Sequence, residues 1–209
     1  MNERYKGYAF WIAGICVVLF LLQLVSGITD LFVLDASKKL EIWRYLTSIF
    51  LHGGLAHLFY NMFALILFGS ILERTIGGKK FLIVYFVSGI IANIFAVFFY
   101  SSSLGASGAI FGIIGALVII RPGMTVWAFS LPMPMFLAGI LWAVGDLIGA
   151  VAFLSGSPIS NTGNLAHLSG MAIGLILGAV YRDWSPKVRK QIHYVDENRI
   201  REWETSWGR

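Results

Sequence analysis

A serine flanked by small residues is the first candidate for chemistry in this sequence. Gly105-Ala106-Ser107-Gly108 stands where a polar loop gives way to a long apolar run. At the start of a helix a serine can face a water-accessible cavity, its backbone N–H lacks an intrahelical acceptor, and glycines leave room for a substrate backbone. The pattern suits a nucleophile with a built-in oxyanion donor. It equally suits close helix packing, because Gly112 and Gly115 follow.

Three histidines and an asparagine form the second candidate group. His57 and Asn61 are four residues apart and so share one helix face, while His167 lies in a later apolar run. Polar side chains are costly in hydrocarbon, so they indicate either a functional site or a hydrogen-bonded pair between helices. His52, His57 and His167 could instead bind a metal ion, but with no cysteine or carboxylate nearby we expect none.

The composition places these residues in a membrane protein. The 209 residues are 57% hydrophobic and 13% charged, with a mean hydropathy of +0.76, which excludes an ordinary soluble domain. The single cysteine, Cys16, lies in an apolar run, where we interpret it as core filler. We predict an all-α polytopic membrane protein whose residues 1–181 form one compact bundle.

Six apolar runs are candidates to cross a bilayer of roughly 30 Å. The first is too long for the apolar part of a secretory signal and lacks a cleavage site, so we expect a retained helix. Region 124–154 is too long for one span and too short for two, so we place an apolar interfacial loop at 125–133. The predicted spans are 8–27, 55–72, 81–100, 105–120, 134–154 and 164–181.

Glycines predict how two of these spans pack. Gly170, Gly174 and Gly178 recur every four residues in the last span and make a flat strip for a closely packed partner helix. Span 105–120 carries glycines of its own and is the expected partner. Such packing would bring Ser107 and His167 together.

Basic residues predict the orientation. With both termini cytoplasmic, only Lys38, Lys39 and Arg44 fall outside, in agreement with the positive-inside rule. The second, fourth and sixth spans then run in the same direction, and the candidate Ser, His and Asn residues lie near the outer end of each. This shared depth favours one site over a transport path formed by the histidines and Asp146.

The residue types at that depth suit acyl transfer. His167 would act as general base toward the Ser107 hydroxyl and then as general acid toward the leaving amine. Asn61, His57 and the Ser107 N–H would donate hydrogen bonds to the oxyanion. The prediction is a Ser-His dyad that cleaves peptide bonds.

Two further residues have roles that the sequence leaves open. Asp146 lies well inside span 134–154, too deep to serve as a third catalytic residue beside Ser107 and His167. We expect it to pair with a neighbouring helix, and a functional acid is the alternative. Phe111 is four residues after Ser107 and could stack on the His167 ring or simply fill the core.

This combination resembles the rhomboid family of intramembrane serine proteases. The residues that carry the resemblance are Trp43-Arg44, His52, His57, Asn61, Leu72-Glu73 followed by Gly77, Gly105-Ala106-Ser107-Gly108, and Ala166-His167 followed by Gly170 and Gly174. It implies a six-helix transmembrane bundle and a serine endopeptidase, a hydrolase that cleaves membrane-anchored proteins in or next to their transmembrane segments without a cofactor.

The resemblance also implies residue roles. Ser107 would be the nucleophile, His167 its base, and His57 and Asn61 would line the oxyanion site, with His52, Phe111, Gly105 and Gly108 in support. Trp43-Arg44 would belong to the first outer loop, where it could also be only an interfacial anchor. Phe111 stands where the family commonly has tyrosine; it keeps the ring and loses the hydroxyl.

The remaining expectations concern partners and location. Transmembrane substrates should contain helix-weakening residues, because a helix hides its carbonyl groups in its own hydrogen bonds. The basic tail, 182–209, is either an amphipathic helix on the inner leaflet or disordered, and no nucleic-acid motif accompanies it. A prokaryotic cell membrane is the expected location. A non-catalytic protein that captures transmembrane segments is the alternative function.

Overall fold

Helices make up most of the computed structural model, which describes residues 5–25, 27–159, 162–184, 201 and 205–206. Within those ranges, five helices are long and apolar enough to cross a membrane: α1 (Tyr8–Val25), the continuous helix Leu55–Ile76, α6 (Gly78–Phe99), α8 (Met135–Leu154) and α9 (Asn164–Tyr181). A further apolar helix, α7 (Ser107–Ile120), has only 14 residues. The predicted spans are thus helices, with ends that differ by a few residues, while most of the tail lies outside the described ranges.

The second long helix changes its winding midway. It comprises α4 (Leu55–Ala64), a π-helical segment η3 (Leu65–Gly69) and α5 (Ser70–Ile76). The wider π turn holds Phe68, whose ring meets the edge of Trp142 on α8 at a centroid distance of 5.7 Å. Such segments within α-helices are frequent at functional sites.

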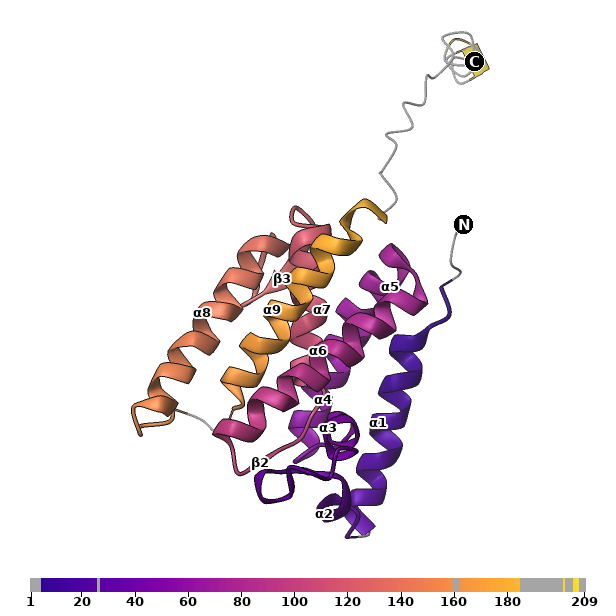
Figure 1. Cartoon of the computed structure of the whole chain (residues 1–209). Helices are drawn as coiled ribbons and strands as arrows, with labels where there is room; N and C mark the ends of the chain where they lie inside the picture. Colours follow the sequence, from indigo (N-terminus) through magenta and orange to yellow (C-terminus); the bar gives the residue numbers. More distant parts are fainter. Residues whose placement is uncertain (1–4, 26, 160–161, 185–200, 202–204, 207–209) are drawn as a thin grey trace.

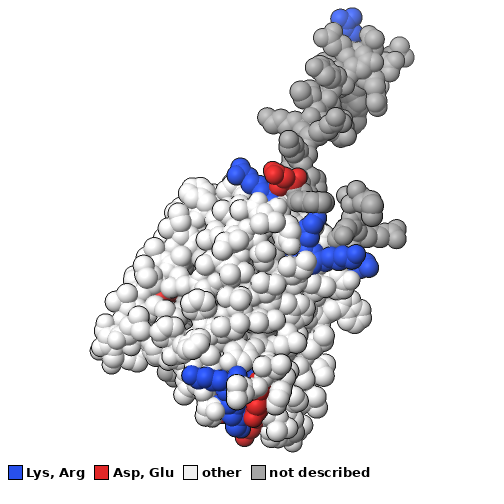
Figure 2. Space-filling view, viewed as in Figure 1, with Lys and Arg blue, Asp and Glu red and all other residues white. Residues whose placement is uncertain are grey.

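The helices alternate in direction. Figure 1 shows α4–α5, α7 and α9 running one way, with α1, α6 and α8 running the other way. The first residues of α4, α7 and α9 therefore lie at the same end of the bundle. On the face that Figure 2 shows, nearly all charged side chains lie near the two ends of the bundle, with a broad uncharged belt between them. Such a belt is what a bilayer requires of a surface that faces lipid.

The region predicted as an apolar interfacial loop, 125–133, instead forms most of a β-hairpin. β3 (Thr125–Ala128) pairs antiparallel with β4 (Leu131–Pro134) in the register Thr125↔Pro134. Val126 and Ala128 are buried, whereas Trp127 is 75% exposed. The prediction of a loop was wrong because this alternation of inward and outward residues favours a strand, and two prolines can be accommodated in a short edge strand.

The closest helix contact in the bundle joins α7 to α9 through glycines. A Cβ atom on Gly170 would collide with the carbonyl oxygen of Gly108, and one on Gly174 would collide with that of Gly112. In the opposite direction, a Cβ atom on Gly115 would collide with the carbonyl oxygen of Met171. The predicted pairing of these two helices is confirmed, with their backbones in direct contact.

A compact connection joins α1 to α4. It contains α2 (Thr29–Phe32), β1 (Leu34–Asp35), η1 (Ala36–Lys38), α3 (Arg44–Thr47) and η2 (Ser48–Phe50), and β1 pairs with β2 (Ser102–Ser103). Buried Arg44 holds it together: its Nη1 donates to the carbonyl oxygens of Asp30 and Val33 at 2.7 and 2.8 Å, and its Nε pairs with Glu41. Arg44 therefore has the specific structural role, whereas Trp43 is 49% exposed.

A buried carboxylate fixes the start of α1. Glu73, at the end of the second long helix, accepts hydrogen bonds from the backbone N–H groups of Lys6, Tyr8 and Ala9 at 3.1 to 3.2 Å. These donors have no intrahelical acceptors, and a negative charge is favourable at a helix N-terminus. Glu73 thus ties α1 to α5.

The α7–α9 contact predicts that Gly174→Ala destabilises the protein strongly. The new methyl group would overlap the Gly112 carbonyl, so the two helices must separate. We expect the thermal unfolding midpoint in detergent to fall by roughly 5 °C or more. The matched control is Gly145→Ala on α8, where an added Cβ meets nothing within 4 Å. Equal midpoints for both variants would contradict the close contact.

Candidate active site

A cavity of about 740 Å³ contains the four candidate residues: His57, Asn61, Ser107 and His167 all line it. Ser107 comes from α7, His57 and Asn61 from α4, and His167 from α9, so three helices that run in the same direction each supply a wall. Helix α7 has 14 residues and therefore rises about 21 Å, less than the roughly 30 Å of hydrocarbon. Its first residue can thus lie below the level of the bilayer surface, with a polar loop and cavity above it.

Ser107 is positioned by the turn that precedes α7. It is the first residue of that helix, so its backbone N–H has no intrahelical acceptor. Gly105 has a φ of +124°, a conformation that favours glycine, and its N–H donates to the Ser48 carbonyl at 2.9 Å. The turn is thereby fastened to η2, and Ser107 is presented half-buried at the cavity wall.

The same glycine also positions His57. A Cβ atom on Gly105 would lie 2.7 Å from Cε1 and 2.9 Å from Nε2 of His57, so the imidazole packs directly on bare backbone. His57 Nδ1 accepts a hydrogen bond of 3.4 Å from the Gly53 N–H. This assignment puts the proton of a neutral ring on Nε2, which makes that atom a donor.

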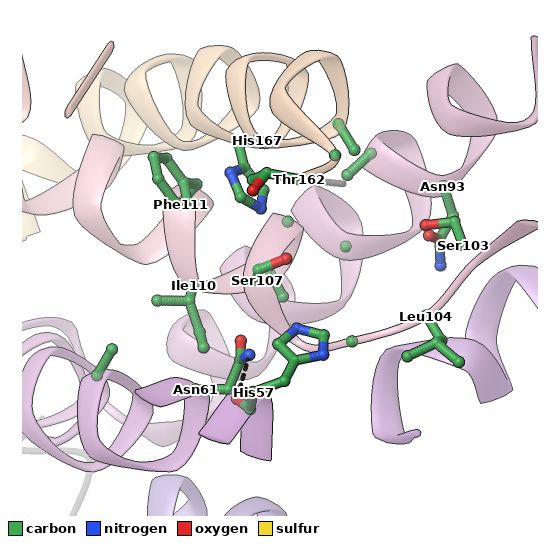
Figure 3. Close-up of a pocket in the computed structure, with 18 of the residues that line it drawn as sticks. His57, Asn61, Asn93, Ser103, Leu104, Ser107, Ile110, Phe111, Thr162 and His167 are labelled. Atoms are coloured by element: carbon green, nitrogen blue, oxygen red, sulfur yellow. Dashed lines mark hydrogen bonds between the residues drawn. The ribbon is translucent and has the colours of Figure 1, made fainter. Parts of the chain in front are cut away.

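Asn61 lies beside His57, one helical turn further on. Its Nδ2 donates to the His57 carbonyl at 2.8 Å, which uses one of the two amide N–H groups and fixes the side chain. Figure 3 shows Asn61 and His57 on one side of Ser107, with His167 on the other side. The Ser107 hydroxyl therefore lies between an imidazole and an amide on one side and a second imidazole on the other.

His167 is held from two directions. Its ring stacks on Phe111 with a centroid distance of 4.3 Å and an interplanar angle of 10°, which confirms the predicted stacking. Its Nδ1 lies 3.1 Å from Oδ1 of Asp146 on α8, and both side chains are buried. Pairing of Asp146 with a neighbouring helix is confirmed. The prediction that Asp146 lies too deep to reach the site was wrong, because its partner is His167 itself.

Ser107 and His167 face each other across the cavity. Figure 3 shows a ring nitrogen of His167 directed toward the Ser107 side chain. In the described part of the chain no hydrogen bond joins the two groups. Hydrogen bonds between catalytic groups are often long or poorly aligned before substrate binds and shorten in the complex.

His52 supports the site from behind and does not line the cavity. Its side chain is 1% exposed, and its ring meets that of His57 at a centroid distance of 5.2 Å. Its backbone pairs with the Gln23 amide of α1: the His52 N–H donates to Oε1 at 3.0 Å and the His52 carbonyl accepts from Nε2 at 3.3 Å. Sequence reasoning missed Gln23, although a polar residue near the end of an apolar span was a usable signal.

Other lining residues were also missed. Asn93 of α6 donates to the Tyr45 carbonyl and to Ser48 Oγ, at 2.8 and 2.9 Å. Tyr100, which caps the end of α6, accepts a hydrogen bond of 3.2 Å from the Leu165 N–H at the start of α9. Asn93 is the only one of these with a sequence signal, as an amide inside an apolar span. Within the described ranges, no group of three or more His, Cys, Asp or Glu residues could hold a metal ion.

Comparisons with known proteins identify relatives of this chain. The family model for the Rhomboid domain matches residues 39–184. The chain is 29% identical over 175 residues to a protein of Haemophilus influenzae named rhomboid protease GlpG, covering 81% of this chain and 88% of that protein. It is 38% identical over 144 residues to the Bacillus subtilis rhomboid protease GluP, covering 66% of this chain and 26% of that protein. An Arabidopsis thaliana relative, named inactive RHOMBOID-like protein 8, is 34% identical over 76% of this chain and 45% of its own length.

The environment of His52 predicts a pH-dependent stability. Burial, together with neighbouring His57, lowers the pKa of His52 from 6.5 to about 4. Between these values the unfolded chain binds a proton that the folded protein does not, so stability is lost as the pH falls from about 6.5 toward about 4. We expect the thermal midpoint in detergent to drop by roughly 5 °C or more from pH 7 to pH 4.5.

The comparison with His52→Asn isolates this histidine from other groups that titrate in the same range. The variant lacks the titrating ring, so its midpoint should fall less over the same pH interval. An identical fall in both proteins would contradict the assignment.

Proposed function

Because the chain belongs to the rhomboid family, we propose that it is an intramembrane serine endopeptidase that uses Ser107 and His167. One observation supports this most strongly. Ser107 is the first residue of a short helix and lines a cavity, and His167 faces it across that cavity. Relatives named rhomboid proteases support the reaction class.

In the proposed mechanism the Ser107 hydroxyl attacks the carbonyl carbon of the scissile peptide bond. The proton from Oγ moves to Nε2 of His167, a C–O bond forms, and the carbonyl π electrons move to the oxygen. His167 then gives this proton to the leaving amine as the C–N bond breaks. Water repeats the sequence on the acyl-enzyme and releases Ser107.

The negative oxygen formed during attack needs donors. The Ser107 N–H, free at the first position of α7, and the His57 Nε2–H are two of them, and the second amide N–H of Asn61 is the third. One such donor is worth roughly 3 to 4 kcal/mol of transition-state stabilisation in comparable sites. His57 and Asn61 therefore contribute by binding the oxyanion.

We further propose a six-helix transmembrane bundle, with α7 as the short central helix and both ends of the chain in the cytoplasm. The charge distribution supports this orientation, because Arg74, Lys79, Lys80, Arg121 and Arg182 lie at the ends of helices opposite the cavity. The cavity would then open toward the outer face of a cell membrane. Its substrates would be transmembrane proteins with helix-weakening residues near that face.

A binding protein without catalytic activity is the second candidate. It is favoured by the similarity to the plant relative whose name marks it as inactive. Retention of Ser107, His167 and the groups around them favours the protease. The two candidates differ in whether purified protein cleaves a substrate or only binds it.

The protease proposal predicts that Ser107→Ala and His167→Ala each abolish cleavage of a fluorescent transmembrane substrate by purified protein in detergent. The loss should be at least roughly 10³-fold, because nucleophile and base act as a unit. The control is Ser169→Ala, which removes a hydroxyl bonded to the Ala166 carbonyl of its own helix; this variant should cleave normally. Cleavage that survives in Ser107→Ala would rule out the serine mechanism.

The oxyanion site predicts a separate effect for Asn61→Ala. Loss of one donor to the oxyanion should lower kcat by roughly 10²-fold and leave KM nearly unchanged, because the interaction forms only in the transition state. Steady-state kinetics on the same substrate measure both constants. A rise in KM at constant kcat would assign Asn61 to substrate binding instead.

A further inference from the structure

Asp146 contacts His167 on the side of the ring that Ser107 does not use. The distance from Asp146 Oδ1 to His167 Nδ1 is 3.1 Å, and the two side chains are 8% and 11% exposed. Asp146 comes from α8, whereas the two residues of the proposed dyad, Ser107 and His167, come from α7 and α9. The contact thus joins a fourth helix to the site through the general base.

Helices α8 and α9 approach each other closely enough for this contact. A Cβ atom on Gly149, three residues after Asp146, would collide with the amide of Asn164, the first residue of α9. The bare backbone at Gly149 therefore lets the start of α9 pack directly against α8. His167 lies one turn further along α9, opposite Asp146.

The pairing is poorly explained as a structural pair alone. Oδ2 of Asp146 is buried and has no hydrogen-bond partner among the described residues. A carboxylate that served only to join helices would gain from partners for both oxygens, because an unpaired polar atom in a membrane protein is costly. Asp146 instead makes its one bond to the ring that the mechanism uses.

We propose that Asp146 is the positioning residue of a Ser107–His167–Asp146 triad; this inference rests on the proposed protease function. The Nδ1–H of His167 donates to Oδ1, which leaves the lone pair of the neutral ring on Nε2. The lone pair is then available to the Ser107 hydroxyl. Phe111 fixes the plane of the ring and Asp146 fixes its rotation and tautomer.

The carboxylate also stabilises the charged intermediate. When Nε2 takes the Ser107 proton the ring becomes a cation, and Oδ1 lies one hydrogen bond away from it. The Nδ1 proton stays on the ring, so Asp146 gains no proton and loses none. The other titratable side chains that line the same cavity include His57 of α4 and Tyr100 at the end of α6. A charged His57 would repel the cation.

The test measures kcat, KM and the rate of Ser107 labelling by a fluorophosphonate probe in Asp146→Asn. Asparagine keeps the shape but removes the charge. We expect kcat and the labelling rate to fall together by roughly 10²-fold or more, with KM within about twofold. The control, Asp183→Asn, makes the same change at an exposed carboxylate beyond α9 and should react normally.

Two further variants distinguish a loss of the Asp146–His167 interaction from a loss of folding. Asp146→Leu removes the polar group and suits an apolar helix, so it should keep the thermal midpoint of the wild type while reacting as slowly as Asp146→Asn. In a His167→Ala background, Asp146→Asn should have no further effect, because the two residues act as a unit.

The outcomes separate this inference from the function that it rests on. Wild-type kcat and labelling in Asp146→Asn, or an equal loss in the presence and absence of His167, would overturn the triad while the protease stands. A wild-type protein that neither cleaves nor labels would overturn the proposed function itself.

Discussion

The site depends on the direct backbone contact between α7 and α9. Three glycines on these helices face carbonyl groups of the other helix. If the two helices moved apart, the packing at all three positions would be lost together. In lipid the hydrophobic effect does not hold helices together, and close packing of small residues is the main source of their association. Ser107 and His167 are carried on these two backbones, and their separation is therefore set by glycine packing rather than by their own side chains.

The bilayer imposes the second constraint, because polar groups must be satisfied within the protein or kept in water. Arg44 and Glu73 meet it with backbone partners and thereby fix the connection before α4 and the start of α1. Helix α7 has 14 residues and rises less than the thickness of the hydrocarbon layer, and its first residue, Ser107, lines a cavity. The same cavity would supply the water that hydrolysis consumes.

Much of the arrangement was predictable from the sequence, because it follows from topology and spacing. The direction of the spans placed the candidate residues at one end, and the four-residue glycine repeat identified α9 as the partner of α7. Helical spacing put Phe111 on the face of Ser107 and allowed either stacking on His167 or plain core packing, and the structure shows the stacking. These features depend on the chain order and on helix geometry alone.

Other features required three-dimensional structure. The depth of Asp146 along α8 was estimated from its place in the span, but its contact with His167 depends on the rotation of α8 and on the close approach at Gly149. The hairpin 125–134 was hidden because its apolar strands resemble an interfacial loop, and the π segment Leu65–Gly69 has no sequence signal. The position of Gln23 near the end of an apolar span was a signal, but its two hydrogen bonds to the His52 backbone join segments 29 residues apart, which no side-chain pattern reveals.

The proposed mechanism requires Ser107 to be a nucleophile that His167 activates. Its most direct test is mass spectrometry of the detergent-purified protein after reaction with a fluorophosphonate, in which the serine oxygen displaces fluoride at phosphorus. We expect one adduct, on the peptide that contains Ser107, and almost none in His167→Ala. An adduct on another residue, or equal labelling of Ser107 without His167, would contradict it.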